Sequence, residues 1–158
     1  MSVVKIGPFG GTGGRMMDIN PNHVPAQLNS IMIWHNEPSG IITAISFRYT
    51  TDQGNTFTVP DKPPNVWGDQ RSSQPHTIEI DNDEDEYVTK IEGSHNGTHL
   101  SSLRITTNKK TSRWFGNQSK GHQHQFSVPL HTGGILGFFV RASTWINAIG
   151  VYVGPIDQ

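Results

Sequence analysis

Glycine and proline are spread along the whole of this sequence, and that distribution is the strongest constraint on its fold. The chain of 158 residues contains 17 glycines and 10 prolines. Proline removes a backbone hydrogen-bond donor, and glycine costs about 1 kcal/mol relative to alanine inside a helix. No stretch shows the 3.6-residue period of an amphipathic helix either. The sequence therefore predicts strands and turns.

Short runs in which apolar and polar residues alternate support this prediction. A period of two places the apolar side chains on one face of a strand, as in a half-buried sheet. Many such runs separated by turn residues predict an all-β sandwich, barrel or prism. No Pro/Ser-rich linker divides the chain, so we expect residues 1–158 to form a single domain. The apolar positions are Ile45, Phe47 and Tyr49; Ile78 and Ile80; Leu103 and Ile105; Phe126, Val128 and Leu130; and Ile149, Val151 and Val153.

Three short segments of the chain echo one another. Residues 42–45, 88–91 and 146–149 all read apolar, small polar, Ala or Lys, and Ile, and each follows a polar turn. Self-similarity of this kind predicts three similar sheets about a pseudo-threefold axis. Chance similarity between short I-x-x-I strands is the alternative.

The composition limits the class of partner. Only 16% of the residues are charged and the formal net charge is -1, which argues against nucleic acid and anionic membranes as electrostatic partners. A polar but weakly charged surface suits neutral hydroxylated ligands.

No apolar stretch approaches the ~20 residues that span a bilayer, so we expect no membrane insertion. The absence of cysteine excludes disulfides and thiolate zinc sites. Without a visible signal peptide, a cytoplasmic or nucleocytoplasmic location is expected.

Three longer stretches carry a family resemblance. They are KIGPFGGTGGRMMDI (5–19), VWGDQRSSQPHTIEI (66–80) and GGILGFFVRASTWINAIGVYV (133–153). Together they resemble the jacalin-related lectins of plants, over residues 4 to about 154. The resemblance implies a type I β-prism of three four-stranded Greek-key sheets, in agreement with the threefold echo. It also implies a carbohydrate-binding protein of stress or defence that needs no cofactor and is not an enzyme.

The resemblance places a carbohydrate site in three loops at one end of the prism. A glycine there lets the backbone approach a sugar closely, and sugar hydroxyls need both donors and acceptors. The uninterrupted Gly-Gly loop favours mannose- or glucose-containing glycans or glycoproteins over galactose. The candidate binding residues are Gly13 and Gly14 in the first loop, Ser143, Thr144, Trp145 and Asn147 in the second, and Ser94, His95, Asn96 and Gly97 in the third, variable loop.

Two of these positions depart from the family pattern. The family's Gly-x-x-x-Asp motif falls on Ser143 to Asn147, so serine replaces the glycine and asparagine the aspartate. Asparagine keeps one acceptor and adds a donor, but the loss of a charge-assisted bond costs about 1 kcal/mol. The sequence therefore leaves three outcomes open: the chain still binds the family's sugars, it prefers a different sugar, or it binds none. In the last case the prism would serve as a protein-interaction or assembly module.

Some family members carry a second site with aspartate at an equivalent position on another sheet. The equivalents here are predicted to be Thr43 and Thr89. Neither is a carboxylate, so we expect a single site. Because weak single sites gain strength through multivalency, we also expect a homodimer or a larger homo-oligomer.

Other possible sites are weaker. Residues 81–92 place acidic side chains at calcium-loop spacing, but Glu86 stands where such a loop needs glycine. His122 and His124 face the same side of a strand without further metal ligands, so no metal is expected. The basic stretch 108–120 is interpreted as a solvated hairpin. No nucleophile elbow, phosphate-binding loop or metalloprotease motif is present, and nothing in the sequence supports an enzyme.

Overall fold

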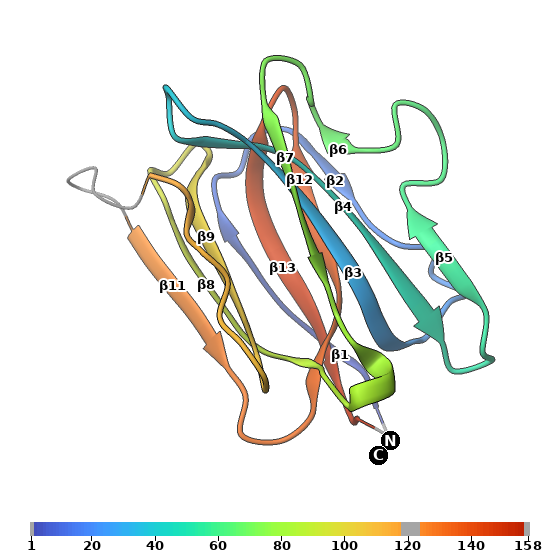
Figure 1. Cartoon of the computed structure of the whole chain (residues 1–158). Helices are drawn as coiled ribbons and strands as arrows, with labels where there is room; N and C mark the ends of the chain where they lie inside the picture. Colours follow the sequence, from blue (N-terminus) through green and yellow to red (C-terminus); the bar gives the residue numbers. More distant parts are fainter. Residues whose placement is uncertain (1, 118–123, 157–158) are drawn as a thin grey trace.

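The computed structural model describes residues 2–117 and 124–156, which form short strands joined by tight turns (Figure 1). The one helical segment in these ranges is a 3-10 turn, η1 (Asn82–Glu84). The prediction of an all-β chain is confirmed. The strands are β1 (Val4–Gly10), β2 (Arg15–Met17), β3 (Pro25–Asn36), β4 (Ile41–Thr51), β5 (Thr56–Val59), β6 (Trp67–Gly68), β7 (Gln74–Glu79), β8 (Val88–His95), β9 (Leu100–Thr107), β10 (Phe115–Gly116), β11 (His124–Pro129), β12 (Gly134–Ala142) and β13 (Ile146–Gly154).

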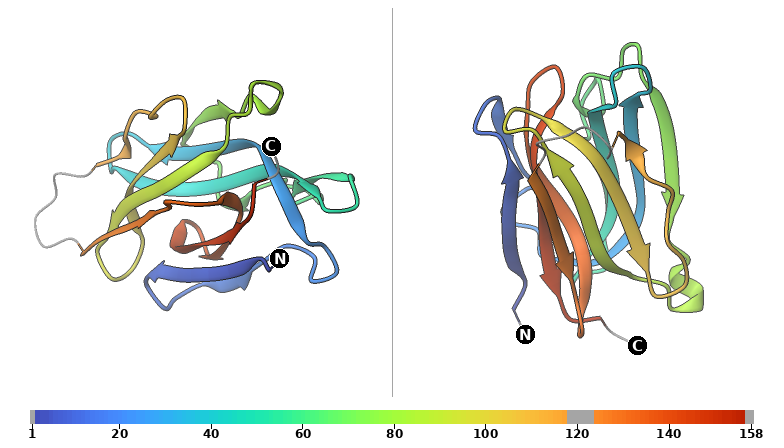
Figure 2. Two further views of the ribbon diagram at one scale, coloured as in Figure 1. Left: turned by 90° about the horizontal axis from the view of Figure 1, so that it is seen from below. Right: turned by 90° about the vertical axis from the view of Figure 1, so that its left-hand side faces the viewer.

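The strands form the three faces of a prism. Hydrogen bonds link them into an eight-stranded and a five-stranded sheet. The eight-stranded sheet consists of two groups of four, joined by the single pairing of Ile135 with Val88. We call β2-β12-β13-β1 sheet I, β11-β8-β9-β10 sheet II, and the five-stranded group around β3 and β4 sheet III. The expected β-prism with three sheets is confirmed, and Figure 2 shows the sheets around a common interior.

Each sheet has the same Greek-key connection. A long hairpin forms its centre: β12–β13, β8–β9 or β3–β4. In sheets II and III the strand that follows the hairpin, β10 or β5, pairs with the hairpin's second strand. A later strand, β11 or β7, pairs with the hairpin's first strand. In sheet I these outer strands are β1 and β2, so the N-terminal segment completes a sheet whose hairpin lies near the C-terminus.

An aromatic-glycine pair marks the pseudo-threefold symmetry. Gly10, Gly68 and Gly116 each follow an aromatic residue, and their φ angles are 138°, 98° and 80°. In each copy the N–H after the glycine donates to a carbonyl at the start of a hairpin's second strand. The three bonds are Gly11 N to Asn147 O (2.9 Å), Asp69 N to Thr43 O (2.9 Å) and Asn117 N to Ser101 O (2.7 Å).

These bonds correct one part of the predicted repeat. Thr43 and Asn147 are equivalent, as expected. The segment 88–91, however, lies on β8, the first strand of its hairpin, and the equivalent segment is 100–103 on β9. Ser101 therefore takes the position assigned to Thr89. The short I-x-x-I pattern misled the alignment because it describes either strand of a buried hairpin equally well.

The core lies between the three sheets and is rich in aromatic side chains. The ring of Phe47 on β4 lies 5.3 Å from that of Phe138 on β12 and 5.6 Å from that of Trp67 on β6, measured between centroids. Phe9 of sheet I stacks on Phe126 of sheet II at 5.1 Å. Edge-to-face and stacked pairs add about 0.5–1.5 kcal/mol each to the burial of their area. The loops that begin and end the strands are thus held by a rigid interior.

The two ends of the prism differ. Both termini and η1 lie at one end, and the loops before β9 and β13 lie at the other (Figures 1 and 2). Within the described ranges, no helix has the length and apolar character needed to cross a bilayer.

Candidate functional site

Three loops from distant parts of the sequence meet at the end of the prism away from the termini. They comprise residues 11–14 after β1, residues 96–99 between β8 and β9, and residues 143–147, which form the β12–β13 turn and the first two residues of β13. The right-hand view of Figure 2 shows them as adjacent blue, yellow and red loops. We call this region the three-loop end.

Asn147 is bonded to all three loops. Its backbone carbonyl accepts the Gly11 N–H at 2.9 Å, and its side-chain Nδ2 donates to the carbonyl of Thr98 at 3.1 Å. Its Oδ1 accepts the hydroxyl of Ser143 at 3.0 Å. The residue is only 4% exposed. Asn147 is therefore a structural junction of the site, with most of its amide already engaged within the protein.

The Gly13-Gly14 segment covers the side chain of Asn147. Gly14 has a φ of +74°, and a Cβ built on it would lie 2.5 Å from Oδ1 of Asn147. Arg141 fixes the segment from β12, because its Nε donates to the Gly13 carbonyl at 3.0 Å and its Nη2 to the Gly14 carbonyl at 3.1 Å. Glycine is needed here for both its positive φ and its lack of a side chain.

The third loop is ordered by its own side chains. Oδ1 of Asn96 accepts the N–H groups of Thr98 at 2.9 Å and His99 at 3.0 Å. Nδ1 of His95 accepts the Gly97 N–H at 3.1 Å. These bonds hold the Thr98 carbonyl in position toward Asn147.

Ser94 occupies a different place from its three predicted neighbours. It is 3% exposed, and its hydroxyl lies 2.6 Å from that of Ser102 on the adjacent strand. Its place within sheet II suits support of the loop better than contact with a ligand.

The second loop presents exposed polar residues and one aromatic ring. Ser143 and Thr144 are exposed, and the Ser143 N–H donates to the Trp145 carbonyl at 2.9 Å, which closes a tight turn. The Trp145 ring lies 5.2 Å from that of His99, so the two loops share an aromatic wall. Within the described ranges the indole N–H of Trp145 is buried without a hydrogen-bond partner. The loops offer backbone N–H groups, hydroxyls and an amide, a set that suits neutral hydroxylated ligands.

The structure thus brings eight of the ten predicted residues to the three-loop end. His95 lies at the end of β8 and supports the third loop, and Ser94 lies behind it. Sequence reasoning missed Arg141, Thr98 and His99. Thr98 and Arg141 act through a backbone carbonyl and a long side chain that reaches another loop, and neither leaves a motif. His99 lies just beyond the predicted boundary of the third loop.

Comparison with known proteins identifies the family. The jacalin-like lectin domain matches residues 6–152. The chain belongs to the jacalin-like lectin family. Horcolin from Hordeum vulgare subsp. vulgare is 36% identical over 157 residues, which cover 96% of this lectin and 97% of horcolin. A mannose/glucose-specific lectin from Parkia platycephala is 30% identical over 161 residues, which cover 99% of this chain and 33% of the longer relative. Among solved structures, a mannose-binding jacalin-related lectin from Ananas comosus superposes with a TM-score of 0.80 at 30% identity, covering 97% of this chain and 98% of that one.

The position of sheet III equivalent to the site is crowded in this lectin. The Thr43 hydroxyl donates to Oγ of Ser73 at 2.7 Å, and the carbonyl of Trp34 lies 3.3 Å away. By the alignment on the aromatic-glycine pairs, Asp69 and Arg71 stand where Gly11 and Gly13 stand in the first site. They form a bidentate ion pair, in which Nε of Arg71 donates to Oδ1 of Asp69 at 3.0 Å and Nη2 donates to Oδ2 at 2.7 Å. Side chains therefore stand at two positions that are glycine in the first site.

In sheet II, the position equivalent to Asn147 lies only partly within the described residues. Ser101 is 3% exposed, and within the described ranges its hydroxyl has no hydrogen-bond partner. The loop that would face it continues into residues 118–123, which lie outside the described residues, as does His122 of the histidine pair. The basic stretch 108–120 also ends there.

One group of side chains in the described ranges has metal-ligand spacing. The ligand atoms of His35, Glu37 and His76 lie within 4.8 Å of one another. Nδ1 of His35 accepts the Gly116 N–H at 2.9 Å, so the hydrogen-bond network places the proton of the neutral ring on Nε2. That nitrogen faces Nε2 of His76 at 3.0 Å. A metal needs an unprotonated nitrogen, so the geometry favours a histidine–histidine hydrogen bond that ties β3, β7 and β10 together.

The buried ring of His35 makes stability depend on pH. Burial lowers its pKa below the ordinary value of about 6.5, and the charges of His76 and Arg113 lower it further, against a smaller opposite effect of Glu37. The unfolded chain therefore binds a proton at this residue before the native protein does. The stabilising contribution is complete above about pH 6.5 and is lost as the pH falls below that value.

We expect the free energy of unfolding to fall between pH 7.5 and 5.5, and to fall less in His35→Phe. Urea unfolding at the two pH values measures both differences. A residual pH dependence is expected in the variant, because burial and His124 also lower the pKa of His95. An unchanged difference between the two pH values in His35→Phe would contradict the assignment.

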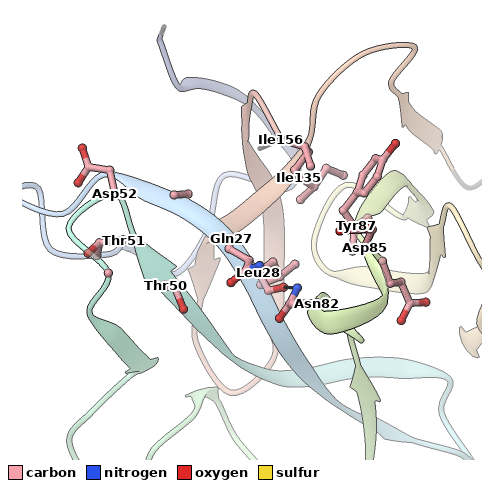
Figure 3. A pocket seen from close by; sticks show the side chains of 14 residues that line it. Gln27, Leu28, Thr50, Thr51, Asp52, Asn82, Asp85, Tyr87, Ile135 and Ile156 are labelled. Atoms are coloured by element: carbon pink, nitrogen blue, oxygen red, sulfur yellow. Dashed lines mark hydrogen bonds between the residues drawn. The ribbon is translucent and has the colours of Figure 1, made fainter. Parts of the chain in front are cut away.

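A cavity also lies at the opposite end of the prism. It measures about 320 Å³ and is lined by residues of β3, β4, β12 and the segment around η1 (Figure 3). Asp52 and Asp85 lie on opposite sides of it. The nearby Glu86 carboxylate accepts the Asp81 N–H at 2.8 Å and the Thr107 hydroxyl at 2.6 Å. Glu86 is only 4% exposed and braces the turn from inside, so at this residue the expectation of a solvated acidic turn is wrong.

Proposed function

We propose that this jacalin-like lectin binds mannose- or glucose-type glycans at the three-loop end. The observation that carries the proposal is the convergence of residues 11–14, 96–99 and 143–147 on Asn147. Relatives described as mannose/glucose-specific or mannose-binding lectins, at about 30% identity over nearly the whole chain, support the same ligand class. The relatives are lectins, which agrees with binding of a glycan without chemical change.

The residues of the proposed site have different roles in sugar recognition. The exposed backbone of Gly13 and Gly14 lets a sugar ring approach closely, and the backbone N–H groups of Thr144 and Trp145 supply donors at fixed positions. The amide of Asn147 accepts from one hydroxyl and donates to another. Without a carboxylate the bond to the ligand loses charge assistance. This costs about 1 kcal/mol, or about fivefold in affinity, relative to an aspartate.

The proposal includes a single site on each chain. At the sheet III equivalent, the Thr43 hydroxyl is bonded to Ser73 and the Arg71–Asp69 pair occupies the place of the glycines. Useful avidity then depends on a homodimer or larger assembly that presents several sites together.

A second candidate function is a protein-interaction or assembly module in which the sugar site is degenerate. One observation favours it. Both polar atoms of the Asn147 amide are bonded within the protein, and the residue is 4% exposed. Under this alternative, a change at Asn147 has no effect on glycan binding because there is none.

Isothermal titration with methyl α-mannoside, and then with a mannose-rich oligosaccharide, tests the proposal. We expect saturable binding by the wild type, with one site per chain and little response to methyl α-galactoside. Asn147→Ala should lose this binding while keeping a cooperative thermal unfolding transition, because the side chain supplies the central donor and acceptor. Thr43→Ala is the matched control, and it should bind as the wild type does. Equal binding by Asn147→Ala and the wild type would move the site elsewhere.

A further inference from the structure

The amide of Asn147 has little unused capacity. Its Oδ1 has two lone pairs, of which one is taken by the Ser143 hydroxyl at 3.0 Å. One N–H of Nδ2 is taken by the Thr98 carbonyl at 3.1 Å. The backbone of Gly13 and Gly14 covers both atoms so closely that added Cβ atoms would lie 3.3 Å from Nδ2 and 2.5 Å from Oδ1. A sugar hydroxyl therefore cannot reach this amide unless something moves.

Ser143 is the partner that can move most easily. Thr98 and Gly14 approach Asn147 through the backbone, which Asn96 and Arg141 hold in place. Ser143 approaches through a hydroxyl on an exposed side chain. Rotation about its χ1 moves that hydroxyl to another staggered position without any change in the backbone.

We infer that Ser143 is a specificity gate: its hydroxyl occupies the position on Oδ1 of Asn147 that a glycan hydroxyl must take. This inference rests on the proposed function, since it assigns a ligand hydroxyl to Asn147. A glycan binds only when it replaces the Ser143 hydroxyl with a donor in the same place. The gate lowers affinity for all ligands and selects those that donate to Oδ1 with good geometry.

The substitutions at positions 143 and 147 then act as a pair. With a carboxylate at 147, a serine hydroxyl at 143 would hold a strong charge-assisted bond and close the site more firmly. With asparagine at 147 the competing bond is neutral and can be exchanged for one from a ligand at a small net cost. The site thus combines a weaker acceptor with an internal competitor for it.

Ser143→Ala removes the competitor and keeps the Cβ, so it separates the gate from any effect on the backbone. We expect it to bind methyl α-mannoside about fivefold more tightly than the wild type by isothermal titration, the value of one neutral hydrogen bond. Ser143→Thr keeps a hydroxyl and should stay closer to the wild type. Ser127→Ala, which removes an exposed hydroxyl on β11 outside the site, is the matched control and should leave the affinity unchanged.

The outcomes are distinguishable. Tighter binding by Ser143→Ala with an unchanged Ser127→Ala supports the gate. Equal or weaker binding by Ser143→Ala, with saturable binding by the wild type, overturns the gate and leaves the lectin function standing. If neither the wild type nor Ser143→Ala binds the mannoside, both the gate and the proposed function are wrong.

Discussion

Gly68→Ala is expected to destabilise the protein by about 3 kcal/mol. Gly68 has a φ of +98°, and a Cβ there would lie 2.1 Å from the Thr43 carbonyl oxygen. A side chain in the left-handed region costs about 1–2 kcal/mol, and forced overlap in a packed interior costs about 1–3 kcal/mol more. The overlapping atom belongs to the backbone of a central strand and cannot rotate away. Urea unfolding of the variant and the wild type measures the difference.

Gly54→Ala is the matched control for this prediction. Its φ of +84° is similar, but a Cβ there would have nothing within 4 Å. It should therefore show only the conformational cost of about 1–2 kcal/mol. Equal losses of stability in the two variants would contradict the idea that the aromatic-glycine pairs are close-approach points that hold the three sheets in register.

Gly14→Ala is expected to abolish measurable glycan binding at the three-loop end. The new Cβ would lie 2.5 Å from Oδ1 of Asn147 and 2.7 Å from the Ala142 carbonyl oxygen. Either the Gly-Gly loop must lift away from β12, or the Asn147 amide must leave its position between Ser143 and Thr98. Both changes remove the arrangement of donors and acceptors that the proposed site requires. Isothermal titration with methyl α-mannoside measures the loss.

The effect of Gly14→Ala must be separated from a general loss of stability. Gly54→Ala is again the matched control, because Gly54 also has a positive φ and lies at the far end of the prism, outside the proposed site. It should retain full binding at a similar or smaller loss of stability. Wild-type affinity in Gly14→Ala would show that the Gly-Gly loop takes no part in recognition.

Much of the fold could be predicted because burial leaves a simple pattern in the sequence. The alternation around Phe47, Leu103 and Val151 correctly located the inward faces of β4, β9 and β13. The threefold arrangement was also visible, but only in part. The aromatic-glycine pairs were a better marker of the repeat than the I-x-x-I segments, since each is tied by a hydrogen bond to one defined position. The segments alone led to Thr89 instead of Ser101.

The candidate site was predictable in location and not in detail. Residue types placed Gly14 and Asn147 together through the family resemblance, and the structure puts them in contact. The bond from Ser143 to Asn147 depends on side-chain rotamers, which no sequence pattern specifies. The bond from Asn147 to the Thr98 carbonyl depends on the path of a loop whose residues carry no motif. These contacts decide whether Asn147 is available to a ligand, so the sequence alone left sugar binding open.

The most direct test of the account is an NMR titration of the ¹⁵N-labelled protein with methyl α-mannoside. It follows every backbone amide and the side-chain amide of Asn147. The account predicts saturable shifts concentrated at Gly13, Gly14, residues 96–99 and residues 143–147, with the Asn147 side-chain signals among the largest. Saturable shifts that map to another face of the prism, or a spectrum unchanged by the sugar, would contradict it.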